Sequence, residues 1–302
     1  MAADDKDLAP LRARIDSIDQ QLLDLLAARA EAAQAVGKIK HNVNAPVFRP
    51  ERERQVIDGL IAKNKSPLAA DGITYIWREI MSACRALEAP VRVAYLGPAG
   101  TFSEQAAFAQ FGQSISRVPC SSIDEVFRAV DAGSADFGVA PVENSSEGAI
   151  SRTLDLLLDT DLKITGEVAL SIKHHLLTKT GQLDGVTRVL AHPQALAQCQ
   201  RWLSSNAPKL DRQAVSSNGE AAKLAAQDST VAAIAGDSAQ QQYALQAVQS
   251  QIQDDPHNRT RFVVISHGSC QPSGKDQTSV ILSVNNKPGA VHQLLAPLAK
   301  HG

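Results

Sequence analysis

The sequence predicts a multidomain protein: an all-α module, then a two-lobed α/β domain, then the beginning of a small third domain. Three observations indicate this. Apolar residues in the first ninety positions recur at intervals of three and four, strand-like and helix-like segments alternate from Val91 onward, and a linker rich in Pro, Ser and Gly begins at Gln271. We therefore expect domains over residues 1–90, 91–270 and 271–302.

The composition is that of a soluble globular protein. Of its 302 residues, 44% are hydrophobic and 21% are charged, and the formal net charge is −2. This charge gives no basic surface for nucleic acid, and no apolar run reaches the roughly 20 residues of a membrane span. Residues 1–11 lack the apolar core of a signal peptide. The four cysteines are far apart and lack metal-site spacing, so we expect a reducing, cytoplasmic location.

The first module carries a heptad pattern that a single copy cannot bury. Apolar residues from Leu8 to Ile39 form one stripe, and no proline interrupts residues 11–45, which predicts one helix of about 35 residues. Such a helix is roughly 50 Å long, whereas a compact domain of this size has a radius of gyration of about 12 Å. We therefore expect an intertwined homodimer. Shorter helices are expected over 51–64 and, after a break at residues 65–67, in a segment that runs to Glu88.

A cation interrupts this stripe. Arg29 stands where the pattern requires an apolar residue, and Leu25 and Ala33, four positions away on either side, cannot pair with it. A buried arginine costs several kcal/mol unless it is paired, which favours a bound anion as its partner. Lys40 follows about three turns later on nearly the same face. A set of solvated surface cations is the alternative, but it does not explain Arg29.

Four segments of this module resemble the all-helical chorismate mutase family: Leu11–Asp16, Leu25–Arg29, Val36–Lys40 and Arg49–Glu53. The resemblance covers nearly all of the first ninety residues. It implies that cations from two subunits hold the carboxylates of chorismate, and that the rearrangement needs neither nucleophile nor cofactor. The implied residues are Arg12 from one subunit, Arg29, Lys40 and Arg52 from the other, Glu53 at the ring hydroxyl, Cys84, and Glu88 beside Lys40 at the ether oxygen.

Three positions depart from the family pattern. Arg49 replaces a frequent acid, Cys84 replaces a serine, and some members have glutamine at Glu88. A carboxyl group donates a hydrogen bond only when it is protonated. Our hypothesis is that the mutase rate falls as rising pH removes the proton from Glu88, and a rate independent of pH would contradict it.

The second domain alternates strands and helices, which is typical of an α/β fold rich in parallel strands. Polar residues gather beyond strand ends, where such sheets bind ligands: Gly97–Ser103 and Glu143–Gly148 are two examples. Each could also be an ordinary helix cap, and one residue of Glu143–Gly148 is expected to cap a helix over 149–158. We expect the stretch 162–177 to pass between two lobes, and Cys199 to be packed rather than reactive.

Residues 254–266 run from a charged loop into a strand. Because side chains alternate across a strand, Thr260 and Phe262 face one way, and Arg259 and Arg261 face the other. A hydroxyl between guanidinium groups suits a small anion whose leaving group needs a proton. Solvated arginines at a junction of loop and strand are the alternative.

Four motifs in this domain are similar to those of the prephenate dehydratase family: Gly97–Ser103, Pro141–Ser145, His192–Gln194 with Cys199, and Asn258–Phe262. The resemblance implies a fold like that of periplasmic binding proteins, with prephenate between the lobes. Departure of hydroxide requires a proton donor, which the resemblance assigns to Thr260, and we take Glu143 as the group that polarises it. Further candidates for substrate binding are Ser103, Asn144, Ser145, Ser217 and Arg261, whereas Asn218 departs from a threonine common in the family.

The last segment resembles the opening strand and helix of a ferredoxin-like ACT regulatory domain. A strand is predicted over 278–284 and a helix over 290–300, and Gly289, Ala290 and Val291 match part of a phenylalanine-binding motif. An isolated pair of this kind cannot bury a core. We therefore expect a truncated domain with impaired inhibition by L-phenylalanine.

Together the resemblances imply a bifunctional enzyme of phenylalanine biosynthesis. It would convert chorismate to prephenate as an isomerase, and prephenate to phenylpyruvate as a lyase, without a metal or cofactor. Two alternatives stay open: a two-lobed protein that binds or senses a small anion without catalysis, and an enzyme with one active module.

Replacing Thr260 with alanine is expected to lower the dehydratase kcat about 10²-fold or more, the usual size of an acid–base contribution. The mutase rate is expected to stay unchanged. Separate assays of chorismate and prephenate turnover on the purified variant check this, and equal loss of both activities would indicate unfolding instead.

Overall fold

The computed structural model describes residues 5–42, 48–272, 274 and 276–301. Its contacts divide the chain into two compact units, Met1–Cys270 and Gln271–Gly302, and each is described by itself. The sequence also predicts a turn over residues 44–50, of which 44–47 lie outside the described residues, as do positions 273 and 275 of the predicted linker. None of the described helices combines the length and the apolarity that a membrane span requires.

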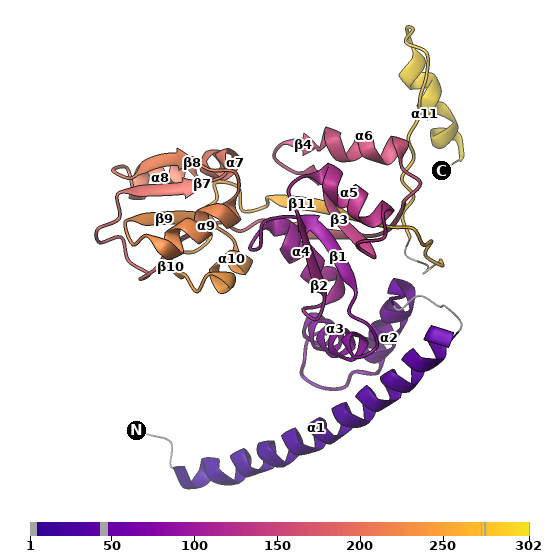
Figure 1. Ribbon diagram of the computed structural model, residues 1–302, viewed down its shortest axis with the longest axis vertical. Helices are drawn as coiled ribbons and strands as arrows, with labels where there is room; N and C mark the ends of the chain where they lie inside the picture. Colours follow the sequence, from indigo (N-terminus) through magenta and orange to yellow (C-terminus); the bar gives the residue numbers. More distant parts are fainter. Residues whose placement is uncertain (1–4, 43–47, 273, 275, 302) are drawn as a thin grey trace. The chain divides into compact units, whose positions relative to one another are not determined.

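The first unit opens with a helical segment made of α1 (Asp5–Asn42), α2 (Pro50–Lys63) and α3 (Ala70–Ala86), drawn in Figure 1. α1 has 38 residues, which confirms the long helix predicted from the uninterrupted heptads. α2 begins at a proline, whose fixed φ suits the first helical turn, and acidic residues in that turn complement the helix dipole.

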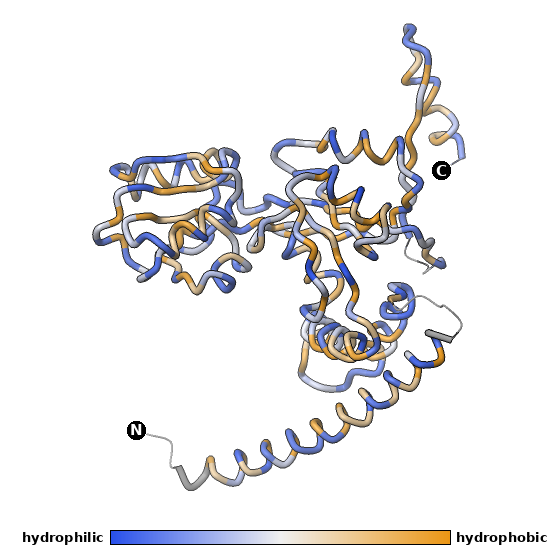
Figure 2. Tube along the Cα trace, in the orientation of Figure 1, coloured by the Kyte–Doolittle hydropathy of each residue, from blue (hydrophilic) through white to orange (hydrophobic). Residues whose placement is uncertain are grey.

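The apolar stripe of α1 is exposed to solvent in a single copy. Leu22, Leu25 and Ile39 are 51%, 67% and 66% exposed, and Figure 2 shows apolar residues recurring along the helix. In contrast, Ile57 of α2 and Ile73 of α3 are buried. The pattern read from the sequence is therefore present, but nothing in the described single chain covers it.

The first lobe is built on a mixed sheet in the order β2-β1-β3-β11-β5, with β4 paired to β3. β1 runs parallel to β2 and β3, whereas β11 runs antiparallel to β3 and β5. Its strands are β1 (Arg92–Leu96), β2 (Ser116–Cys120), β3 (Phe137–Asn144), β4 (Gly148–Ala149), β5 (Lys163–Ser171) and β11 (Arg259–Ser266), and its helices are α4 (Phe102–Phe111), α5 (Ile123–Asp131) and α6 (Ser151–Asp159).

The second lobe has a sheet in the order β10-β6-β9-β7-β8. Its strands are β6 (His175–Thr178), β7 (Arg188–Ala191), β8 (Asp211–Ala214), β9 (Val231–Ala235) and β10 (Gln246–Gln249), and its helices are α7 (Pro193–Gln198), α8 (Gln200–Asn206), α9 (Asn218–Gln227) and α10 (Asp237–Gln242). β7 runs parallel to β8 and β9, and β6 runs antiparallel to β9 and β10.

Two chain segments join the lobes (Figure 1). The chain leaves the first sheet after β5 and enters the second at β6, so the prediction that residues 162–177 pass between lobes is confirmed. It returns through residues 250–258 to β11. The two segments are hydrogen bonded: Ile172 N donates to Asn258 O at 2.8 Å, and Ile252 N donates to His174 O at 2.8 Å.

Two edge strands were not predicted from the sequence. β2 and β10 were not expected, and both lie at the edge of a sheet. β2 contains Pro119, and its burial alternates between intermediate and exposed. Proline is tolerated at edges because one side of such a strand makes no ladder bonds, so the usual apolar alternation is missing.

Two further expectations differ in detail. The sequence predicts a single helix over residues 195–203, and the structure instead has two helices, α7 and α8, that meet at Cys199. No residue of the Glu143–Gly148 segment caps α6, because Gly148 and Ala149 pair with β3 as β4 and the helix begins after Ile150.

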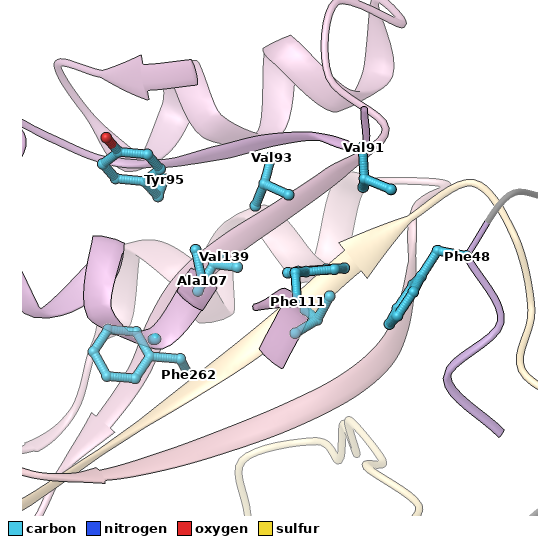
Figure 3. Close-up of a cluster of buried hydrophobic side chains, with 10 residues drawn as sticks. Phe48, Val91, Val93, Tyr95, Ala107, Phe111, Val139 and Phe262 are labelled. Atoms are coloured by element: carbon cyan, nitrogen blue, oxygen red, sulfur yellow. The ribbon is translucent and has the colours of Figure 1, made fainter. Parts of the chain in front are cut away.

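Phe48, which precedes α2, lies in the core of the first lobe (Figure 3). It is 5% exposed, and its ring centroid is 4.8 Å from that of Phe111 and 5.3 Å from that of Phe137. Tilted and edge-on aromatic pairs at this distance are favourable. The helical segment therefore supplies an aromatic side chain to the neighbouring lobe.

The second unit contains α11 (Ala290–His301), as predicted. The strand expected over 278–284 is not formed, because a strand needs a hydrogen-bonded neighbour and the described residues of this unit supply none. Its large apolar side chains are exposed: Val280, Ile281, Leu282, Val284, Val291, Leu295 and Leu298.

Replacing Phe48 with alanine is expected to lower the free energy of unfolding by about 3–5 kcal/mol, the usual cost of emptying a buried phenylalanine site. Urea titration followed by intrinsic fluorescence measures this. Leu158→Ala, which removes a side chain 59% exposed in the same lobe, is the matched control and should change little. Equal effects of the two variants would show that Phe48 is not part of the core.

Candidate active sites

The first candidate site, the Lys40 cluster, consists of Arg29 and Lys40 of α1, Glu53 of α2 and Glu88 after α3. Lys40 Nζ lies 3.7 Å from Glu88 Oε2. Gly37 permits this approach of α1, because a Cβ there would lie 2.6 Å from Glu88 Cγ. Glu88 Oε2 is buried and has no hydrogen-bond partner among the described residues. A buried oxygen that lies beside a cation but makes no hydrogen bond is suited to a polar atom of a ligand.

Glu53 forms a buried ion pair with Arg85 of α3. Burial raises the pKa of Glu53, and the nearby cations Arg85, Arg78 and Arg29 offset part of that rise. Arg29 is therefore close enough to interact with a carboxylate on α2. Its local sequence neighbours did not predict this partner, because it comes from another helix.

The other expected residues of this site are more scattered. Cys84 is buried on α3, while Arg52 and Arg12 are exposed on α2 and α1. Arg12 precedes Arg29 by 17 residues in one continuous helix, which corresponds to about 25 Å. One copy of the chain cannot bring both cations to the same small molecule.

The second candidate site, the Thr260 network, begins at two strands. Thr260 of β11 lies opposite Asn144 of β3, and both are buried. Asn144 Nδ2 donates to Thr260 Oγ1 at 2.8 Å and to Asn258 Oδ1 at 3.1 Å. Because the threonine oxygen accepts this bond, its own O–H proton is directed elsewhere and can be donated to a ligand.

Asn258 extends the network into the second lobe. Its Nδ2 donates to Gln198 Oε1 at 3.1 Å, and that oxygen lies 2.9 Å from His174 Nε2. His174 Nδ1 and Gln198 Nε2 are buried and have no hydrogen-bond partner among the described residues. Ser145 joins the network by donating to Asn258 Oδ1 at 3.4 Å and accepting from the N–H of Arg259 at 2.9 Å.

Three members of this network, Asn258, Gln198 and His174, were not among the expected site residues. Asn258 opens one of the motifs, and Gln198 immediately precedes Cys199 in another, so both carried a sequence signal. His174 carried none, because only the crossing between the lobes brings it to Gln198.

Glu143 does not contact Thr260, contrary to the expectation that it polarises the hydroxyl. Arg261 Nη1 donates to Glu143 Oε2 at 2.5 Å, and the same guanidinium donates to Glu167 at 2.8 and 2.9 Å. Residues opposite each other in a sheet share a face, so Glu143 lies with Arg261 on one face, and Asn144 lies with Thr260 on the other. The two carboxylates raise the pKa of Arg261. Arg261, which was expected to bind substrate, is therefore already paired within the protein.

A helix N-terminus lies at each of the two binding candidates Ser103 and Ser217. Thr101 caps α4 by accepting from Glu104 N at 3.4 Å, and Ser217 caps α9 by accepting from Glu220 N at 3.0 Å. Ser103 is buried in the first turn of α4. Such termini offer N–H groups to anions.

Asn218, where the family commonly has threonine, uses its side chain within the protein. Its Oδ1 accepts from His192 N at 2.9 Å, which links the start of α9 to the start of α7. Cys199 is fully buried, and burial with the nearby Asp254 raises its pKa to about 12. This confirms that Cys199 is packed rather than reactive.

The two lobes touch next to the N-terminus of α4. Glu104 is buried and accepts from Tyr95 Oη at 2.8 Å in the first lobe and from Ser238 Oγ at 3.4 Å in the second. A Cβ at Gly219 would lie 2.6 Å from Ala99 O, and one at Gly236 would lie 2.8 Å from Phe102. Only glycine permits so close an approach of the lobes at these two points.

Comparisons with known proteins identify both halves. Residues 11–89 match the family model for chorismate mutase type II, and residues 93–270 match that for prephenate dehydratase. A bifunctional chorismate mutase/prephenate dehydratase of Pseudomonas aeruginosa is 49% identical over 306 residues, covering 99% of this chain and 84% of the relative. This chain belongs to the bifunctional chorismate mutase/prephenate dehydratase family.

The mutase/dehydratase is therefore an enzyme with two activities. It converts chorismate to prephenate, and prephenate to phenylpyruvate with loss of CO2 and water, in phenylalanine biosynthesis. Both activities are supported, and a binding protein without catalysis is not.

Solved structures resemble the α/β part. Prephenate dehydratase from Arthrobacter aurescens, in complex with L-Phe, is 29% identical, has a TM-score of 0.62, and the match covers 70% of this chain and 72% of that one. GqqA, described as a novel type of quorum quenching acylase, is 26% identical, with a TM-score of 0.57 and coverage of 69% and 77%. Proteins with different described activities therefore share this two-lobed fold.

His174 makes stability depend on pH. Burial, followed by the charge of His175, lowers the pKa of His174, and its bond to Gln198 only partly opposes this. As pH falls below about 6.5, the unfolded chain binds a proton at His174 that the folded chain does not bind. The contribution of neutral, buried His174 to the free energy of unfolding is therefore complete above that pH and is lost progressively below it.

We expect His174→Gln to reduce the fall in free energy of unfolding between about pH 7.5 and pH 5.5, measured by urea titration. His257→Gln, at an exposed loop position, is the control and should keep the full fall. An unchanged pH dependence in His174→Gln would show that the buried ring is not its source.

Proposed function

We propose that the mutase reaction takes place at the Lys40 cluster, completed by Arg52 and by Arg12 of a second copy. The observation that carries this is the buried Glu88 Oε2, which lies 3.7 Å from Lys40 Nζ and has no hydrogen-bond partner among the described residues. In this proposal, the guanidinium groups of Arg29, Arg52 and the second Arg12 bind the two carboxylates of chorismate, and Glu53 accepts the hydrogen bond of the ring hydroxyl.

Catalysis then consists of positioning and charge stabilisation. Binding both carboxylates selects a folded conformer of the substrate in which the bond-forming carbons are close. As the ether bond breaks, negative charge develops on its oxygen, and the ammonium group of Lys40 stabilises it. Cys84, buried on α3, contributes packing at the same site.

The proposal includes an intertwined homodimer. Its support is the exposed apolar stripe of α1, with Leu11 and Leu25 at 57% and 67% exposure, together with the distance of about 25 Å that α1 imposes between Arg12 and Arg29. A second α1 packed along the stripe would bury those side chains and bring its own Arg12 to the first copy's Arg29.

For the dehydratase reaction we propose that Thr260 donates a proton to the departing hydroxyl of prephenate. The bond between the ring carbon and the carboxylate breaks, CO2 leaves, and the electron pair of that bond enters the ring. The bond between the ring and the hydroxyl oxygen then breaks, and the hydroxyl takes the Thr260 proton and leaves as water. Proton transfer leaves negative charge on Thr260 Oγ1. The Asn144 amide, which donates to this atom at 2.8 Å, stabilises that charge. Asn144 thus takes the part first assigned to Glu143.

The substrate carboxylates have other donors available in this proposal. Ser103 and Ser217 lie at the N-termini of α4 and α9, and Ser145 lies beside Asn258. Arg261 takes an indirect part, since its two carboxylate partners already hold it on the opposite face.

We also propose that residues 276–301 belong to an ACT-type domain that binds L-phenylalanine at Gly289, Ala290 and Val291. Support comes from the relative from Arthrobacter aurescens in complex with L-Phe and from the turn itself, where Gly289 has φ +80° and Ala290 is buried. A hollow beside this turn is lined by Ser283, Val284, Asn285, Lys287, Ala290 and Gln293.

A mixing experiment tests the shared mutase site. Arg12→Ala and Arg29→Ala are each expected to lose most mutase activity alone. Co-expressed in equal amounts, half of the dimers carry one copy of each, and one of their two sites has neither defect, so activity should recover to about a quarter of the wild-type value.

The matched control is a mixture of Arg29→Ala with Lys40→Ala. Both residues come from the same copy in each site, so every site in the mixed dimer keeps one defect and activity should not recover. Mixed dimers of Arg12→Ala and Arg29→Ala that are purified by differential tags yet stay inactive would contradict the proposal.

A further inference from the structure

We propose that Arg85 is a positioning residue of the mutase site, which holds Glu53 in place by anchoring it to the dehydratase part of the chain. This rests on the proposed role of Glu53 at the ring hydroxyl. Arg85 belongs to none of the family motifs quoted above, and it is only 7% exposed.

Three different segments of the chain surround the Arg85 guanidinium. Nη1 donates to Glu53 on α2, Nη2 donates to Phe111 O at 2.6 Å, and the guanidinium carbon lies 4.7 Å from the centroid of the Phe48 ring. The planar group thus uses two edges for hydrogen bonds and one face for a cation–π contact. A side chain held on three sides cannot shift without breaking one of these contacts.

The contact with Phe111 crosses from the helical segment to the first lobe. Phe111 is the last residue of α4, where carbonyl groups have no partner within the helix and carry the negative end of its dipole. A guanidinium group at this point both satisfies a carbonyl and complements that dipole. Arg85 therefore links a mutase residue to a dehydratase helix.

Close packing around this contact fixes the distance between α3 and the lobe. A Cβ at Gly112 would lie 2.4 Å from the Cβ of Ser82. Ser82 Oγ accepts from Ser114 N at 3.1 Å, and Glu79 Oε2 accepts from Gln113 N at 3.1 Å. α3 thus lies directly on residues 111–114, and no side chain fits between them.

The charges near Glu53 show what Arg85 contributes. Burial favours the protonated form of Glu53, and the cations that oppose this are Arg85 and Arg78 from α3 and Arg29 from α1, with Arg85 the strongest. Arg85 in turn faces Glu53, Glu88 and Glu79. Without the Arg85 cation, Glu53 would keep its proton to higher pH and would be a poorer acceptor for a hydroxyl group.

The first test is the pH profile of mutase kcat/KM in Arg85→Met and Arg85→Lys. We expect Arg85→Met to lower the neutral-pH value about tenfold and to move the acid limb of the profile to higher pH. Arg85→Lys should restore part of both, because it keeps the charge. Dehydratase kcat/KM should change by less than about twofold. An acid limb that stays in place in Arg85→Met would overturn the inference.

Variants of Glu53 separate this inference from the proposed function. If Glu53→Ala, which removes the acceptor that glutamine would keep, leaves mutase kcat/KM unchanged, the role of Glu53 itself is wrong. If Glu53→Gln lowers it and removes the acid limb while Arg85→Met has no effect, the role of Glu53 stands and that of Arg85 is refuted.

The second test uses paired glycine variants in the dehydratase part. Gly112 and Gly133 both have positive φ, +76° and +69°, so alanine strains the backbone at each, and more so at Gly112, whose ψ of 179° lies in a region essentially restricted to glycine. A Cβ at Gly112 meets Ser82 of α3, whereas one at Gly133 meets no atom within 4 Å. We expect Gly112→Ala to lower mutase kcat/KM several-fold and Gly133→Ala to leave it unchanged, and equal effects on mutase activity would contradict the anchoring role.

Discussion

The pairing of β11 with β3 is the interaction on which the α/β part depends. The chain leaves the first lobe after Ser171 and returns at Arg259, and only this return completes the first sheet. Residue-by-residue register then places Thr260 opposite Asn144. Both the fold and the position of the Thr260 hydroxyl therefore depend on contacts between residues more than a hundred positions apart, and the second lobe must offset the entropy cost of closing that loop.

The same pairing explains how one strand serves two purposes. Alternation sends Thr260 toward Asn144 and Asn258, where three buried polar side chains satisfy one another. It sends Arg261 toward Glu143 and Glu167, where the ion pairs are partly exposed. Buried polar groups are tolerated only when they are hydrogen bonded, so the uncharged amides and hydroxyl occupy the inner face, and the charged groups lie nearer to water.

In the helical segment, buried charge is the organising constraint. Glu53 and Arg85 would each be costly alone, because an unpaired buried charge destabilises a fold strongly. Their mutual pairing, the Phe111 carbonyl and the Phe48 ring together make the burial tolerable. The cations of α1 differ from one another, since Arg29 and Lys40 are half-buried near the carboxylates of Glu53 and Glu88, whereas Arg12 is exposed.

The sequence was a good guide where a feature depends on local periodicity. The length of α1 followed from the apolar spacing, and the opposite faces of Thr260 and Arg261 on β11 followed from alternation. It was a poor guide where register between distant segments decides. Glu143 and Thr260 were both predicted near strand ends. Which face of the sheet Glu143 occupies depends on its pairing with Arg261, which lies 118 positions away in the sequence.

Arg85 and His174 were missed for the same reason. A cation on a helix carries no local mark that distinguishes a surface position from a buried one with an acid on another helix. Edge strands β2 and β10 lacked an apolar pattern, and the strand expected over 278–284 had no neighbour among the described residues. Sequence periodicity indicates which secondary structure a segment can adopt. Whether the segment adopts it also depends on a partner segment that is distant in the sequence.

The insertion of Phe48 into the first lobe bears on how such two-enzyme chains can be recombined. A chimaera that joins the helical segment of one relative to the α/β part of another would have its genetic crossover near residue 90, yet the aromatic ring and its socket lie on opposite sides of that junction. The two halves of such a chimaera would fit only if the side chain at position 48 matched the volume of its buried site in the first lobe. The two parts are therefore expected to co-evolve at this contact, even though they catalyse separate reactions.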